Sequence, residues 1–196
     1  MYHNPVLLKQ SVDDLVTNPD GTYVDCTFGG GGHSKEILSR LSDKGKLFSF
    51  DQDLDALKNT IEDPRFTLIN QNFRFLENSL LMYGVSQVDG ILADLGVSSH
   101  QFDEADRGFS TRFDAALDMR MDQRQKATAA DILKNLSELQ LHKMFEQYGE
   151  VTNAKTLAAH IVQQRTRLPF ATIDQFKAMI SSVVKGNPNK YLAQVF

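Results

Sequence analysis

The sequence predicts an α/β fold whose first half forms a parallel sheet and whose second half forms only helices. Two observations support this prediction. In residues 1–103, short apolar segments rich in β-branched and aromatic residues alternate with segments of helical periodicity, which is the pattern of βαβ units. After residue 127 the apolar residues follow helical spacing alone, and helix-capping signals recur.

Four segments of the first half are expected to be strands, because each is nearly continuously apolar, as strands buried on both faces are. They cover residues 22–28, 46–51, 66–70 and 88–94, and helices are expected at residues 33–41, 54–61 and 75–83. Four parallel strands are few for a doubly wound sheet, and the sequence stops in an amphipathic segment at residues 192–196. We therefore expect a fragment, with further strands beyond residue 196.

The second half is expected to contain four helices after a charged loop. The loop covers residues 103–122, and the helices cover residues 128–136, 138–148, 153–167 and 173–185. Ser137 with Gln140, and Thr172 with Gln175, match the capping box that begins a helix.

The composition is typical of a globular protein, with 41% hydrophobic and 23% charged residues. Apolar runs do not approach the roughly 20 residues that a membrane helix needs, so no membrane association is expected. The single cysteine, Cys26, excludes an internal disulfide and fits a reducing cytosol. Histidine and cysteine do not cluster at metal-ligand spacing, so no metal site is predicted.

The charge is unevenly distributed along the chain. Residues 1–103 carry 8 basic and 15 acidic side chains, whereas residues 104–196 carry 13 basic and 10 acidic ones. This asymmetry fits either a catalytic domain beside a polyanion-facing one or ordinary surface variation. A group of basic residues in the loop fits either phosphate contacts or pairing with nearby acids; it consists of Arg107, Arg112, Arg120, Arg124 and Lys126.

Four consecutive glycines, residues 29–32, separate the first predicted strand from its helix. Such a turn lets the backbone approach a ligand closely, and the helix that follows presents free N–H groups to an anion. A dinucleotide fingerprint would need a glycine where Ser34 or Lys35 stands, and the closing Gly-Lys-Ser/Thr of a P-loop is absent. The loop therefore predicts a ligand site of another kind, with a tight structural turn as the alternative.

Two acidic residues stand at the ends of predicted strands. Asp51 ends the second strand about 20 residues beyond the glycines, where an acid can accept hydrogen bonds from ribose hydroxyls. Alternatively, Asp51 or Asp53 caps the next helix. Asp94 ends the fourth strand, at the sheet edge where open parallel sheets bind ligands, and there it could hold an amino group. Its alternative role is that of a turn residue.

Several ordered motifs together resemble one family, the MraW/RsmH family of 16S ribosomal RNA cytosine-N4 methyltransferases. The motifs are His3-x-Pro5-Val-Leu-Leu8, Asp25-Cys-Thr-Phe-Gly-Gly-Gly-Gly-His33, Phe50-Asp51-x-Asp53, Asp89-Gly-Ile-Leu-x-Asp94-Leu-Gly-Val-Ser-Ser99, Arg107-Gly-Phe-Ser110, Leu117-Asp-Met-Arg-Met-Asp122 and Tyr148-Gly-Glu150. They are spread over nearly the whole chain, which makes the resemblance specific.

This resemblance implies a Rossmann-like, S-adenosylmethionine-dependent methyltransferase sheet, incomplete here, with an inserted all-helical domain. The expected domains are the first part of the core at residues 1–103, the helical insertion at 104–188 and the start of a return to the core at 189–196. It also implies a bacterial, cytoplasmic enzyme that acts on 16S rRNA of the small ribosomal subunit. Whether the protein is a homodimer is left open.

The resemblance further implies which residues contact S-adenosylmethionine: Gly31, Gly32, His33, Asp51, Phe73, Asp94 and Gln101. Phe73 would stack near the adenine. Asp94, or a backbone carbonyl in its turn, is the candidate catalytic acceptor for the cytosine amine. Family members continue well past the point that matches Phe196, which fits the expected truncation.

Two other functions share some of these features. A nucleotide-dependent oxidoreductase would have the same sheet and an acid at Asp51, but it would bind NAD. A non-catalytic RNA-binding module would bind rRNA with a salt-dependent affinity and ignore both cofactors.

Overall fold

The computed structural model describes residues 5–196, so His3 of the first motif lies outside the described residues. The chain divides into two compact units. The first runs to Ser98 and includes residues 121–123, and the second comprises residues 99–120 and 124–196. The domain boundaries expected from the sequence, at residues 103 and 188, remain a prediction.

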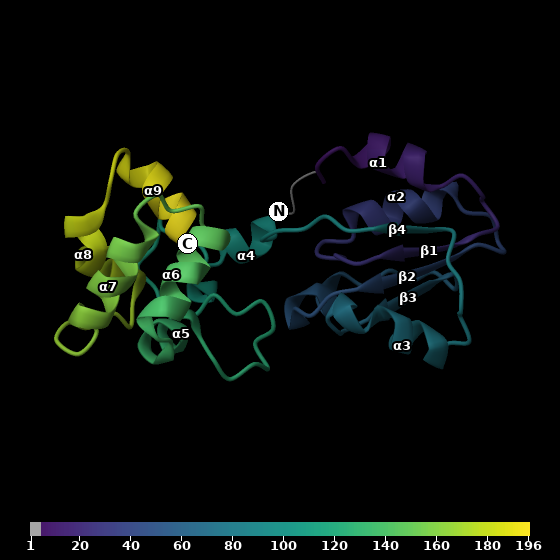
Figure 1. Ribbon diagram of the computed structural model, residues 1–196. Coiled ribbons are helices and arrows are strands. Elements are labelled where there is room, and N and C mark those ends of the chain that lie inside the picture. Colours follow the sequence, from purple (N-terminus) through teal and green to yellow (C-terminus); the bar gives the residue numbers. More distant parts are fainter. Residues whose placement is uncertain (1–4) are drawn as a thin grey trace. The chain divides into compact units, whose positions relative to one another are not determined.

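The first unit contains a four-stranded, fully parallel sheet with strand order β3-β2-β1-β4 (Figure 1). The strands are β1 (Thr22–Asp25), β2 (Lys46–Phe50), β3 (Phe66–Ile69) and β4 (Gly90–Leu92). All four predicted strands are confirmed. Each ends before its predicted end, because the chain leaves the sheet to form the turns at its carboxyl edge.

Helices cover both faces of this sheet (Figure 1). Helices α1 (Leu8–Leu15) and α2 (Gly32–Arg40) lie on one face, and α3 (Leu76–Met82) lies on the other. Leu47 belongs to one buried cluster with Ile37 of α2, whereas its neighbour Phe48 belongs to another with Leu80 of α3. Successive side chains of a strand thus point to opposite layers, both of them apolar.

The segment after β2 differs from the prediction. It forms a 3-10 helix, η1 (Leu54–Asn59), instead of an α-helix with an apolar face of Leu54, Leu57 and Ile61. Leu54 and Leu57 are exposed, and Ala56 is the buried residue of this turn. An amphipathic pattern stabilises an α-helix only where its apolar face is buried, and this segment is too short to be helical by propensity alone.

Helix α1 was not predicted from the sequence. It begins after Leu7, which has a left-handed backbone (φ 51°) and supplies no side-chain cap, so the usual start signal is missing from the sequence. Its buried residue Val12 joins the cluster that contains Ile37. Tertiary packing therefore stabilises this helix.

Arg65 connects the start of β3 to the end of α2. Its guanidinium donates to both carboxylate oxygens of Asp63, at 2.9 and 2.7 Å, and to the Leu41 carbonyl at 2.7 Å. The hydrogen bonds from Arg65 lower the pKa of Asp63 from its ordinary 3.8 to about 2. Asp63 therefore remains ionised in the folded protein at pH values that protonate it in the unfolded chain.

This pair predicts a pH-dependent contribution to stability. Because the folded pKa is the lower one, the contribution is fully present above about pH 4 and is lost as the pH falls towards 2. We expect Asp63→Asn to destabilise the protein at pH 6, and we expect the difference from the unsubstituted protein to shrink below pH 4. Urea denaturation of both proteins at several pH values measures this. A difference that stays constant with pH would contradict the assignment.

The second unit is helical. Its α-helices are α4 (Ser99–Asp103), α5 (Ala129–Asn135), α6 (Glu138–Gln147), α7 (Ala154–Gln164), α8 (Ile173–Ile180) and α9 (Pro188–Val195). The four predicted helices correspond to α5–α8, and the two predicted capping boxes, at Ser137 and Thr172, are formed. Helix α9 was not predicted, although Asn187 caps it and Pro188 stands at its first turn.

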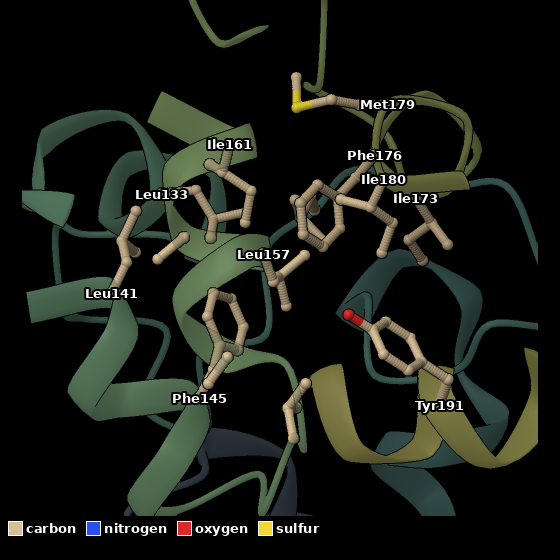
Figure 2. Packing of buried hydrophobic residues seen from close by; sticks show 14 residues of the cluster. Leu133, Leu141, Phe145, Leu157, Ile161, Ile173, Phe176, Met179, Ile180 and Tyr191 are labelled. Atoms are coloured by element: carbon tan, nitrogen blue, oxygen red, sulfur yellow. The ribbon is translucent and has the colours of Figure 1, made fainter. Parts of the chain in front are cut away.

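One apolar cluster forms the core of this unit. Figure 2 shows Leu157 of α7 near the middle of the cluster, with Phe145 and Phe176 from the neighbouring helices around it. Tyr191 of α9 is buried in the same cluster. The described residues form no helix that is long and apolar enough to cross a membrane.

The basic residues of the loop are at least partly engaged with acids. Arg120 pairs with Asp118 and Arg112 pairs with Asp103, each at 2.7 Å. The guanidinium of Arg112 also lies over the ring of Phe102, 4.9 Å from its centroid. Pairing with acids, one of the two interpretations of this loop, therefore holds for Arg112 and Arg120.

Candidate cofactor site

The glycine loop leaves the carboxyl end of β1 and leads into α2. Gly29 and Gly31 have left-handed backbones, with φ values of 51° and 77°. Side chains are disfavoured in that region, which explains glycine at both positions. A Cβ atom added at Gly29 would meet nothing within 4 Å, so the loop is open on this side. The open side is where a ligand can approach the backbone.

Gly32 is required by a different contact. A Cβ atom there would collide with the ring of Pro5, which packs against the start of α2. The next residue, His33, is buried, and its Nε2 donates to the Val6 carbonyl at 3.2 Å. The N-terminal segment thus covers part of the loop, and the predicted cofactor contact at Gly32 stays a prediction.

Asp51 holds the other side of the glycine loop. One of its carboxylate oxygens accepts the Gly29 N–H at 2.8 Å, and the other accepts the Asp53 N–H at 2.9 Å. Asp53 in turn accepts the Asp55 N–H at 3.1 Å and caps η1. The capping role is therefore confirmed for Asp53. Each carboxylate oxygen has two lone pairs, so a carboxylate that accepts backbone N–H groups can also accept ligand hydroxyls.

Three asparagines that the sequence reasoning missed support these turns. Asn59 donates to the Gly29 carbonyl at 3.0 Å, and Asn70 donates to the Asp51 carbonyl at 2.9 Å. Asn72 donates to Gln52 Oε1 at 2.7 Å and also caps the next helix. Because Asn70 and Asn72 follow a predicted strand, the sequence could have indicated that they lie near the site. The local sequence does not show which turn they contact.

Phe73 begins that helix, the 3-10 helix η2 (Phe73–Phe75). This residue is 40% exposed. The bond between Asn72 and Gln52 places the turn before Phe73 beside the segment that follows Asp51. The ring is thus available for stacking near the turn that carries Asp51.

Asp94 follows β4 and lies close to the glycine loop. Its backbone N–H donates to Thr27 Oγ1 at 2.8 Å, and its carboxylate lies 3.9 Å from Nδ1 of His33. The Asp94 side chain is 49% exposed, whereas His33 is buried. The structure therefore brings Asp94 close to His33, and Asp51 to the glycine loop, at the carboxyl ends of β4, β2 and β1.

A buried polar network lies beneath the loop. Asp25, at the end of β1, accepts the Ser34 hydroxyl at 2.7 Å, and Ser34 is bonded to Ser49 at 2.8 Å. Burial raises the pKa of Asp25. Burial also raises the pKa of the Cys26 thiol to about 11, so Cys26 is protonated at neutral pH. These residues support the turn from within the sheet.

Gln101, the last predicted cofactor contact, belongs to the second unit. It lies in α4 and is buried there. Its contact with the cofactor therefore remains a prediction.

The parallel sheet, the glycine loop and the acids at the strand ends define an α/β protein of the Rossmann-like class, with a candidate ligand site at the carboxyl edge of the sheet. The family model of the MraW methylase family matches residues 1–195, and the chain belongs to that family. The resemblance inferred from the motifs is thereby confirmed.

Curated relatives agree with this assignment. The chain is 58% identical to a protein of Christiangramia forsetii, 56% identical to one of Flavobacterium johnsoniae and 53% identical to one of Bacteroides fragilis, each named ribosomal RNA small subunit methyltransferase H. All of this chain is covered in each comparison, but only 65%, 65% and 64% of the respective relatives. The chain therefore spans just under two thirds of their length.

Proposed function

We propose that the whole protein is an S-adenosylmethionine-dependent methyltransferase that modifies N4 of a cytidine in the decoding region of bacterial 16S rRNA. One observation carries the proposal. The open glycine loop, Asp51 and Asp94 converge where β1, β2 and β4 end. Family membership and the names of the relatives support methyl transfer to small-subunit rRNA.

The residues present fit the chemistry of this cofactor. The carboxylate of Asp51 suits ribose hydroxyls, and the exposed ring of Phe73 suits adenine. The N–H groups that begin α2, at Gly32 and His33, suit the methionine carboxylate, and Asp94 suits its amino group. When bound, the cofactor supplies an electrophilic methyl group on a sulfonium.

The protein has two tasks in such a transfer. The lone pair of the cytosine amine is delocalised into the ring, so the protein must align this weak nucleophile, which contributes several orders of magnitude in rate. An acceptor for the amine proton further favours attack. The half-exposed carboxylate of Asp94, or a backbone carbonyl of its turn, would accept that proton and pass it to solvent.

The target base must be unpaired or flipped out of its stack to reach such a site. Four basic residues of the helical unit, Arg165, Arg167, Lys177 and Lys185, are candidates for the RNA surface, but two of them have structural roles. Arg165 donates to the carbonyls of Leu133 and Leu136, and Lys177 pairs with Asp174. The remaining candidates are Arg167 and Lys185.

The relatives contain a further segment, about a third of their length, that this chain does not cover. Strand β4 pairs with β1, and among the described residues no other strand pairs with it, while Ile91 is 51% exposed. We propose that a segment corresponding to the remaining third of the relatives continues the sheet at this edge. A cytoplasmic location and a homodimer are further proposals, and the molecular mass in solution tests the second.

Methyl transfer to small ribosomal subunits and to their RNA tests the proposed function. We expect activity from the complete protein, including any segment beyond residue 196. Asp94→Ala should lower the rate by about 10²–10⁴-fold if the carboxylate accepts the proton. Calorimetric titration with S-adenosylmethionine and with NAD separates the alternatives. NAD binding alone would identify an oxidoreductase, and RNA binding without either cofactor would identify a binding module.

A further inference from the structure

Thr27 lies where β1 and β4 stop pairing. The last backbone bond between these strands is donated by the Cys26 N–H to the Leu92 carbonyl at 2.8 Å. Just beyond it, a side chain makes the connection instead, because the Asp94 N–H donates to Thr27 Oγ1 at 2.8 Å. A single hydroxyl thereby joins the turn after β1 to the turn after β4, which are 67 residues apart in sequence.

Asp25 sets the direction of hydrogen bonding through this hydroxyl. The Thr27 N–H donates to Asp25 Oδ1 at 3.0 Å, and the Thr27 hydroxyl lies 3.4 Å from the same oxygen. A backbone N–H only donates, so Asp25 Oδ1 accepts the Thr27 N–H and Thr27 Oγ1 accepts the Asp94 N–H. The hydroxyl therefore directs its proton to Asp25 and offers a lone pair to the N–H of Asp94.

The anchor of this arrangement is rigid. Asp25, Ser34 and Ser49 are all fully buried. Ser34 is hydrogen-bonded to both Asp25 and Ser49, and these bonds connect the end of β1 to α2 and to β2. Well-satisfied buried polar networks hold their members in one geometry. Thr27 extends this network to the turn that carries Asp94.

We propose that Thr27 is a positioning residue, whose hydroxyl holds the Asp94 turn against the glycine loop. The Asp94 carboxylate is half exposed, and its distance of 3.9 Å from His33 is too long for a hydrogen bond. The position of the carboxylate therefore depends on the hydrogen bond from the Asp94 N–H to Thr27. This proposal rests on the proposed function, in which Asp94 faces the cofactor or the substrate amine. Thr27 acts through Asp94 and does not itself touch the ligand.

Two substitutions separate the hydroxyl from the shape of the side chain. Thr27→Val keeps the branched shape and removes the hydroxyl, whereas Thr27→Ser keeps the hydroxyl. In calorimetric titrations of the complete protein with S-adenosylmethionine, we expect Thr27→Val to weaken binding about 5- to 10-fold and Thr27→Ser to stay within about 2-fold. Without cofactor, the Asp94 amide should exchange its hydrogen faster in Thr27→Val but not in Thr27→Ser.

A double-mutant cycle tests whether the effect passes through Asp94. In an Asp94→Ala background, the loss caused by Thr27→Val should fall below about 2-fold, since residues that act as one unit are not additive. An equal loss in both backgrounds, or unchanged affinity in Thr27→Val, would overturn the positioning role alone. If the unsubstituted protein does not bind S-adenosylmethionine, the proposed function is wrong, and the positioning role falls with it.

Discussion

Asp51→Ala is expected to weaken binding of S-adenosylmethionine by about 1–3 kcal/mol, the range for leaving a buried hydrogen-bonding group without its partner. Two effects add in this substitution. The cofactor loses an acceptor for its ribose hydroxyls, and the glycine loop loses the carboxylate that holds the Gly29 N–H at 2.8 Å. Asp51→Asn retains one acceptor oxygen and should lose less. Calorimetric titration of the complete protein measures both losses.

Asp53→Ala is the matched control for this prediction. Asp53 is an acid in the same turn, but its side chain caps η1 through the Asp55 N–H. Its removal should cost about 1 kcal/mol of stability with little change in cofactor affinity. Equal losses of affinity in Asp51→Ala and Asp53→Ala would show that Asp51 acts on the turn and not on the ligand.

Leu157→Ala is expected to lower the free energy of unfolding by about 2–5 kcal/mol. Leu157 has no exposed surface and lies near the middle of the apolar cluster of the helical unit (Figure 2). Truncation removes apolar contacts from several helices at once and leaves a cavity that close-packed neighbours fill only in part. Chemical denaturation followed by circular dichroism measures the change.

Leu139→Ala provides the comparison for Leu157→Ala. Leu139 is the same residue type in the neighbouring helix α6, but 62% of its surface is exposed. Its truncation should change the stability by less than about 0.5 kcal/mol. Similar losses in the two variants would mean that the cluster does not stabilise the unit as its burial indicates.

The strands and the capped helices were readable from the sequence because their signals are local. A short segment rich in aromatic and apolar residues, such as residues 46–51, is typical of a strand buried on both faces. The pair of Ser137 and Gln140 caps a helix with its own side chains. The same reasoning failed for residues 54–61. Their helical pattern is local, but whether its apolar face is buried depends on the rest of the fold.

The candidate site shows the same division. The glycines of the loop, Asp51 and Asp94 were predictable, since the carboxyl ends of parallel strands necessarily share one edge of a sheet. The hydrogen bonds that support these residues were not predictable from the sequence. Asn59 reaches a carbonyl 30 residues away, and Thr27 accepts an N–H 67 residues away. Hydrogen bonds between residues so far apart produce no pattern that can be recognised in the sequence.

The sequence by itself determined the α/β class, the helical second half and the acids at the strand ends, because hydrophobic periodicity is a local signal. It also indicated the family, because its motifs resemble those of known members. Only the tertiary structure decided what each residue of the site contacts. It showed that Gly32 leaves room for Pro5, that Asp53 and not Asp51 is the cap, and that Thr27 holds the Asp94 turn. The physical reason is that contacts between distant segments depend on how the whole chain packs.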